Sequence, residues 1–149
     1  MNNILTYIAI GTFCFLGTKL KVISSEFTEV IPGIASADVV TRFKVGVKSN
    51  GNKKIDIQSI WVKNVKATWS ILDASEQVVD SFSDKNVYTI KGEIRVKSEG
   101  APSKNKSQVV EKGSNYEEDF VLNYRIGDSE TIKVLKIDKI ENMKQLRMQ

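Results

Sequence analysis

The sequence contains no histidine and one cysteine, Cys14. Zinc and copper sites in proteins are almost always built from clusters of these two residue types, so we expect no transition metal and no cofactor. A Ser-His-Asp triad or a Cys-His pair cannot be assembled either. A calcium site made of carboxylates is not excluded. One cysteine forms no disulfide within its chain, which is compatible with any compartment.

Arginine is also scarce, since only 4 of the 22 basic residues are arginine and the rest are lysine. Specific recognition of phosphates and bases relies on the planar fork of arginine, so the composition argues against a nucleic-acid partner. The net charge of +4, with 41% hydrophobic and 27% charged residues, is typical of a soluble globular domain. A length of 149 residues fits one domain.

Long apolar runs are missing except at the start, where residues 4–17 carry no charge before Lys19 and Lys21. A helix that spans a bilayer needs about 20 apolar residues, whereas a run of this length is typical of a signal peptide. The preceding MNN has no basic residue, and no small-residue cleavage site follows closely. Residues 1–20 are therefore a cleaved signal, an uncleaved membrane anchor or a first piece of the fold. We expect export or a place in the cell envelope, with membrane contact through residues 4–17 in the anchor alternative.

Alternation of apolar and polar residues dominates the rest of the chain and predicts short strands with one face in a core. The long run 55–71 exceeds a usual strand, so we expect a break near Asn64. A bulge or burial on both faces is expected where Val134 and Leu135 break the alternation. No amphipathic helix is predicted. The predicted strands cover, in order, residues 39–48, 55–63, 65–71, 77–82, 87–97, 108–111, 116–126 and 131–140.

The number of strands and the turns between them predict an all-β fold. We expect residues 21–142 to form one antiparallel β-sandwich, immunoglobulin-like, with a small β-barrel as the alternative. Residues 143–149 are interpreted as a C-terminal tail. The alternation places nine large side chains in the core: Phe43, Val45, Ile57, Trp61, Trp69, Ile90, Phe120, Leu122 and Tyr124.

The segment 98–107 has the strongest loop signal in the sequence, because it is polar and holds Gly100, Pro102, Lys104 and Lys106. Loops of this length are either functional or simply solvated, so these four residues are candidates for contact with a partner. An edge strand, with its unpaired backbone groups, is the competing surface.

Candidates for chemistry are few. Glu117 and Asp119 are expected on one outward strand face, which is better explained as a solvated face than as an acid–base pair. Glu118 is expected to point inward at a strand end. Trp61 and Trp69 form either an aromatic platform for a sugar or peptide or part of the core, and their alternation favours the core. The sequence contains no phosphate-binding glycine motif. We therefore assign no catalytic, cofactor-binding or metal-binding residue.

These observations favour a non-enzymatic protein-interaction or assembly module of the cell envelope, which binds a protein partner through loops or an edge strand. One alternative is a small carbohydrate-binding domain or a carboxylate-dependent enzyme. Another is a structural subunit of a particle or filament. The identity of the partner does not follow from the residues.

Overall fold

The computed structural model describes residues 18–34, 37–97 and 116–148, and this part of the chain is all-β, as predicted. None of these residues lies in a helix that is long and apolar enough to cross a membrane. The strands are β1 (Leu20–Ile31), β2 (Val39–Ser49), β3 (Ile55–Val62), β4 (Val65–Lys66), β5 (Thr68–Leu72), β6 (Val78–Val79), β7 (Val87–Val96), β8 (Phe120–Ile126), β9 (Lys133–Ile137) and β10 (Lys144–Arg147).

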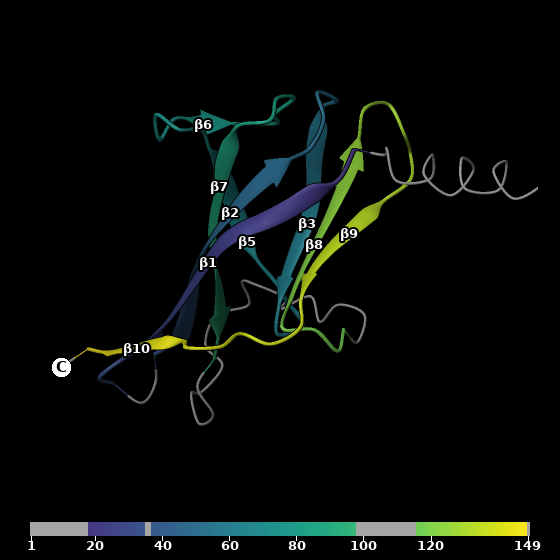
Figure 1. Cartoon of the computed structure of the whole chain (residues 1–149). Helices are drawn as coiled ribbons and strands as arrows, with labels where there is room; N and C mark the ends of the chain where they lie inside the picture. The colour runs from purple at the N-terminus through teal and green to yellow at the C-terminus, as the bar shows by residue number, and fades with distance from the viewer. Residues whose placement is uncertain (1–17, 35–36, 98–115, 149) are drawn as a thin grey trace, which may run out of the picture.

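The strands form two sheets that face each other across one core (Figure 1). One sheet has six strands in the order β10-β1-β2-β7-β5-β6, and the other has four in the order β4-β3-β8-β9. Neighbouring strands are antiparallel except β1 and β10, which are parallel. Over the described residues the two sheets do not close into a barrel, so the barrel alternative is wrong.

Three phenylalanines join the sheets at the centre of the core. Phe27 and Phe43 come from the six-stranded sheet and Phe120 from the four-stranded sheet. The Phe120 ring centroid lies 5.9 Å from that of Phe27 and 5.5 Å from that of Phe43, both edge-on at 73°. Such edge-to-face pairs are stabilising beyond the area they bury. Seven of the nine predicted core residues are buried: Phe43, Val45, Ile57, Ile90, Phe120, Leu122 and Tyr124.

Trp61 is one of the two exceptions, and a β-bulge explains it. Ile57 pairs with Tyr124, but the next pair is Ser59 with Asn123, so Gln58 is an extra residue in β3. A bulge of this kind reverses the alternation beyond it. Ile60 and Val62 therefore face the core, while Trp61 is half-buried on the opposite side of the sheet. Neither the bulge nor the burial on both faces predicted at Val134 and Leu135 is found, since β8 and β9 pair in continuous register and Val134 is 46% exposed.

The predicted break in the long run 55–71 is confirmed. Lys63 and Asn64 connect β3 to β4 and have φ angles of 48° and 63°. Positive φ at two successive residues is typical of the tight turns that join antiparallel strands, and asparagine tolerates it well.

The first and the last described strands, β1 and β10, are neighbours in the six-stranded sheet (Figure 1). Strand β1 begins at the buried Leu20, within the segment 1–20 that the sequence analysis sets apart. Residues 144–147, interpreted above as part of a tail, form β10, which pairs with β1 from Thr28 to Ile31. This stretch is not a free tail, because its backbone is bonded to the sheet.

Candidate functional site

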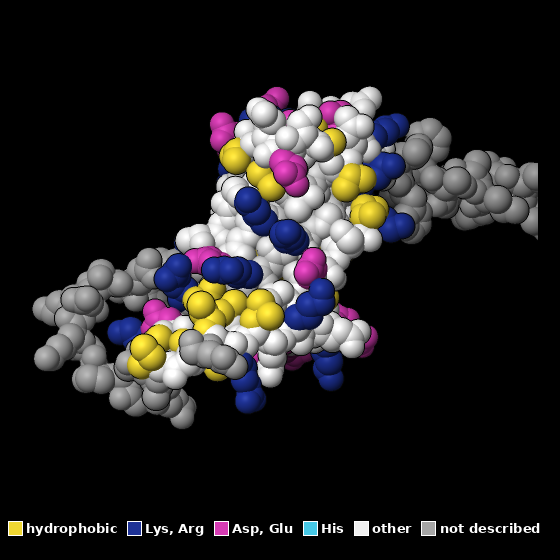
Figure 2. Space-filling model, turned by 90° about the vertical axis from the view of Figure 1, so that its left-hand side faces the viewer, with side chains coloured by type: hydrophobic (Ala, Val, Ile, Leu, Met, Phe, Trp, Pro, Cys, Tyr) yellow, Lys and Arg dark blue, Asp and Glu magenta, His cyan; other side chains and the backbone are white. Residues whose placement is uncertain are grey.

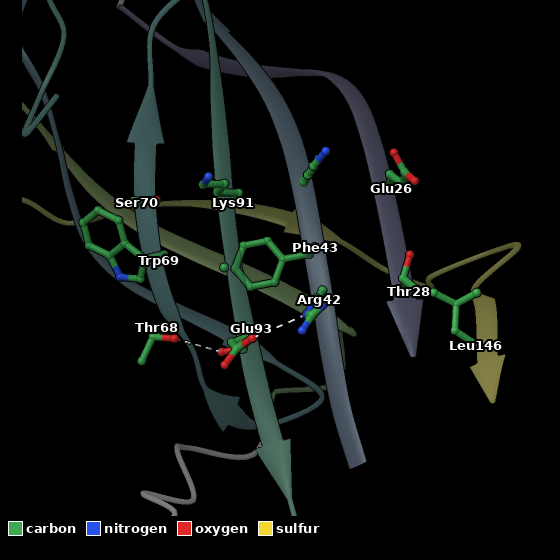
Figure 3. Close-up of a pocket in the computed structure, with 12 residues that line it drawn as sticks. Glu26, Thr28, Arg42, Phe43, Thr68, Trp69, Ser70, Lys91, Glu93 and Leu146 are labelled. Carbon is green, nitrogen blue, oxygen red and sulfur yellow. Dashed lines mark hydrogen bonds and ion pairs between the residues drawn. The ribbon is translucent and has the colours of Figure 1, made fainter. Parts of the chain in front are cut away.

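A groove of about 560 Å³ lies on the outer face of the six-stranded sheet, the face turned away from the four-stranded sheet (Figure 3). The floor is formed by the middle of the sheet, and β10 contributes Leu146 at one end. The lining residues are Glu26, Thr28, Arg42, Phe43, Lys44, Thr68, Trp69, Ser70, Lys91, Gly92, Glu93 and Leu146. A volume of this size is within the range of ligand-binding clefts.

The strand register arranges the polar lining residues in two rows across the sheet. Thr68, Glu93, Arg42 and Thr28 form one row, and Ser70, Lys91, Lys44 and Glu26 form the next. Neighbouring strands lie about 4.8 Å apart, so each row presents side chains at that spacing.

The first row is internally neutralised. Glu93 pairs with Arg95 at 2.8 Å and with Arg42 at 3.6 Å. The Thr68 hydroxyl donates a hydrogen bond to the backbone carbonyl of Glu93 at 3.4 Å. The hydrogen bonds that Arg95 donates to the Glu93 carboxylate raise the pKa of its guanidinium above the ordinary value. This row therefore has little charge left for a ligand.

The second row is not neutralised in the same way. Lys44 and Lys91 lie directly opposite each other on β2 and β7, and neither makes an ion pair with a described residue. Glu26 is across from Lys44 on β1, but its carboxylate is 3.6 Å from the ammonium of Lys144. Figure 3 shows Lys91 on the β5 side of its strand, beside Ser70. The row thus offers two ammonium groups and a hydroxyl to an anionic group.

The rest of this outer face is basic as well. Figure 2 shows lysine and arginine side chains in a band across the middle of the molecule, with hydrophobic side chains gathered below it. On the outward positions of β1, β2, β7 and β10 the only carboxylates are Glu26 and Glu93. The cations at these positions are Lys21, Arg42, Lys44, Lys48, Lys91, Arg95 and Lys144.

Trp69 is the second predicted core residue that is not fully buried. It is half-buried on β5, where it packs against the core and also lines the groove (Figure 3). Gly92 lies opposite both Trp69 and Phe43 and has no side chain to separate them. The floor of the groove at Gly92 is therefore backbone, because the rings of Trp69 and Phe43 are on the core side of the sheet.

Neutralising one of the opposed lysines is expected to stabilise the fold. Like charges directly opposite in a sheet repel, at a cost of roughly 0.2–1 kcal/mol. Lys91→Gln should therefore raise the free energy of unfolding by a fraction of a kcal/mol at low salt, and the gain should shrink as salt screens the charges. Urea unfolding at two ionic strengths measures this, with Lys85→Gln as the control. An equal change in both variants would mean that Lys44 and Lys91 do not repel.

The three carboxylates singled out in the sequence lie before β8 and have structural partners. The Glu118 carboxylate accepts a hydrogen bond from Lys136 at 2.6 Å, which lowers the pKa of Glu118. Asp119 accepts a hydrogen bond from the Ile140 backbone N–H at 2.8 Å, and Glu117 is exposed. A general acid needs a raised pKa, so Glu118 has the opposite tuning. Among the described residues no three His, Cys, Asp or Glu side chains gather as metal ligands.

The other predicted site residues are separated from the groove. Trp61 lies on the outer face of the four-stranded sheet, where its ring centroid is 6.2 Å from that of Tyr116. The two tryptophans therefore do not form one platform. The predicted partner-contact residues Gly100, Pro102, Lys104 and Lys106 lie outside the described residues.

Alternation along β2 and β7 puts Lys44 and Lys91 on outward strand faces, but it does not bring the two residues together. Their meeting depends on the pairing of β2 with β7, which brings together two residues that are 47 positions apart in the chain. No match to this chain was found among protein-family models, curated proteins or solved structures.

Proposed function

We propose that this chain is a non-enzymatic protein-interaction module of the cell envelope, and that it binds an acidic segment of a partner protein in the groove on the six-stranded sheet. The observation that carries the proposal is the opposed pair of Lys44 and Lys91, which lacks a carboxylate partner among the described residues. A carboxylate seated between them forms charge-assisted hydrogen bonds and removes their repulsion.

The proposal includes an immunoglobulin-like sandwich as the scaffold. In that fold one sheet has the strand order A-B-E-D and the other C′-C-F-G. The order β1-β2-β7-β5 and the order β4-β3-β8-β9 correspond to these two sheets, in the same sequence along the chain. Strands β10 and β6 are then additions at the two edges of the first sheet. The buried disulfide of antibody domains has no counterpart, because the chain has one cysteine.

Electrostatic complementarity favours an acidic protein segment over a neutral ligand. The basic band on this face attracts acidic partners and accelerates their association. The mixed character of the groove, with the apolar side chain of Leu146 beside ammonium and hydroxyl groups, fits a peptide that carries both acidic and apolar side chains. The place in the cell envelope rests on the uncharged run of residues 4–17, and fractionation of the native source tests it.

Zero-length carbodiimide crosslinking in the native source tests the groove directly, because it joins an ammonium to a carboxylate only when the two are in contact. We expect Lys44 or Lys91 to be joined to an aspartate or glutamate of the partner. The Lys44→Gln/Lys91→Gln variant should lose the complex, since both ammonium groups are gone. Lys53→Gln/Lys85→Gln makes the same change in net charge at exposed turns and should retain it.

A complex that survives the groove substitutions unchanged would contradict the proposal, and so would a protein that is monomeric and alone in native extracts. Trp61 favours a second candidate, a carbohydrate-binding domain, because its half-buried indole on the outer face of the four-stranded sheet can stack on a sugar. Binding to a neutral glycan on an array, lost in Trp61→Ala and kept in the lysine variant, would select that candidate instead.

A further inference from the structure

Strand β1 has a stretch of open edge that β10 does not cover. β2 pairs with β1 from Leu20 to Val30, on one side. On the other side the described strand that pairs with β1 is β10, and this pairing begins at Thr28. The open stretch is therefore residues 20–27. Edge strands of this kind offer unpaired backbone groups to another chain.

The hydrogen bonds of β1 indicate which backbone groups face the open edge. The Met148 N–H donates to the Ile31 carbonyl at 3.0 Å, so the backbone groups of Ile31 point to the β10 side. Because this direction alternates along a strand, the N–H groups of Phe27 and Ser25 point to the same side. At the start of the strand the Leu20 N–H is bonded to the Tyr124 hydroxyl at 3.3 Å. Ser25 has no such partner among the described residues.

A trench of about 570 Å³ runs beside this edge. Ser25, Glu26 and Phe27 of β1 line one side, and the link from β9 to β10 lines the other with residues Ile137, Lys139, Ile140, Glu141, Asn142 and Lys144. Phe27 belongs to the core, and Ile137 and Ile140 pack against it. The trench therefore has apolar side chains at its base and charged side chains at its rim.

Ser25 shows that the space between the sheets is open at this point. It pairs with Val45, which is fully buried, so the Ser25 side chain is on the core-facing side of β1. Ser25 is nevertheless exposed, whereas Phe27, two residues along the same face, is buried. A chain seated in the trench would cover this opening.

We propose that the trench accepts an extended strand from a partner protein, which pairs with β1 at Ser25 and places apolar side chains against Phe27 and Ile140. Addition of a strand to a sheet edge derives its affinity from backbone hydrogen bonds and its specificity from alternate side chains. This surface is distinct from the groove and goes beyond the function proposed for it.

The shape of the trench selects a single extended segment over a second copy of the chain. The link 137–144 bounds the side opposite β1. A strand seated between the two must therefore have no neighbouring strand of its own on either side. β1 of a second copy is bonded to β2 along its whole length and does not meet this need. The bulge between Val22 and Ser24 also disfavours the meeting of two identical edges.

Selection of linear peptides by phage display on the full chain tests the proposal. We expect the selected peptides to alternate apolar and polar residues. Ser25→Pro should weaken their binding about tenfold or more, because the proline ring replaces the backbone N–H that faces the trench. Ser25→Arg fills the trench with a side chain and leaves the backbone intact, so it should have the same effect. Ser83→Arg, at an exposed loop position, is the matched control and should bind as wild type.

Methylation of alternate backbone nitrogens of a selected peptide should also abolish binding, because pairing with β1 needs those N–H groups. The Lys44→Gln/Lys91→Gln variant should bind the peptide unchanged, which separates this result from the outcome at the groove. Selection of no alternating peptide, peptide binding that tolerates both Ser25 variants, or a peptide-free dimer lost in Ser25→Arg would each overturn the proposal.

Discussion

Replacement of Phe120 by alanine is expected to lower the free energy of unfolding by about 3–5 kcal/mol, the range for large core deletions. The Phe120 ring is fully buried and is the contribution of the four-stranded sheet to the three-ring cluster. Its removal leaves a cavity between the sheets and removes both edge-on contacts at once. Urea unfolding followed by tryptophan fluorescence measures the change.

Phe120→Leu is the control for this experiment, because it keeps most of the apolar volume and should cost less than about 2 kcal/mol. A loss below about 1 kcal/mol in the alanine variant would show that the ring does not bridge the sheets. The slope of unfolding against urea should be similar in all three proteins, since the surface exposed on unfolding is nearly the same.

Gly92→Ala is expected to destabilise the fold by about 3 kcal/mol, at the upper end of the range for overpacking. A Cβ atom at this position would overlap the backbone carbonyl oxygen of Thr68 and lie 2.6 Å from Cζ of Phe43. The carbonyl belongs to the neighbouring strand and cannot move without breaking the ladder between β5 and β7. Thermal and urea unfolding of the variant measure the loss.

Gly127→Ala is the matched control, since nothing lies within 4 Å of a Cβ there and its φ of +59° is the only conflict. That conflict should cost about 1–2 kcal/mol. Equal losses in the two variants would mean that the strands at Gly92 separate enough to admit a methyl group. The larger loss at Gly92 would show that the floor of the groove is rigid.

Most of the strands could be predicted from the sequence, because alternation reports a face that is half in a core. Strand β1 was missed because its alternation is broken: the bulge at Ile23 and the exposed Ser25 interrupt the apolar face. β10 was missed because all its side chains are exposed, so it has no apolar face. Neither strand therefore shows the regular alternation of apolar and polar residues from which a strand is predicted.

The two tryptophans show a different limit. The odd positions of Ile57 and Trp61 suggest one face, and only the pairing with β8 reveals that Gln58 shifts the later residues to the other face. Trp69 is on the predicted face and packs against the core, but it is only half-buried there. The groove itself depends on which strands are neighbours, and alternation within one strand carries no information about that.

The parallel pairing of β1 with β10 determines when the six-stranded sheet can be completed during synthesis. Ile31 and Arg147 are partners although 115 residues separate them, so the pair forms only after residue 147 has left the ribosome. Until then the outer edge of β1 is open along its entire length, and the loop that must close is almost as long as the chain. A nascent chain is therefore exposed to foreign strands for as long as translation lasts, and a chaperone that holds this edge would protect it.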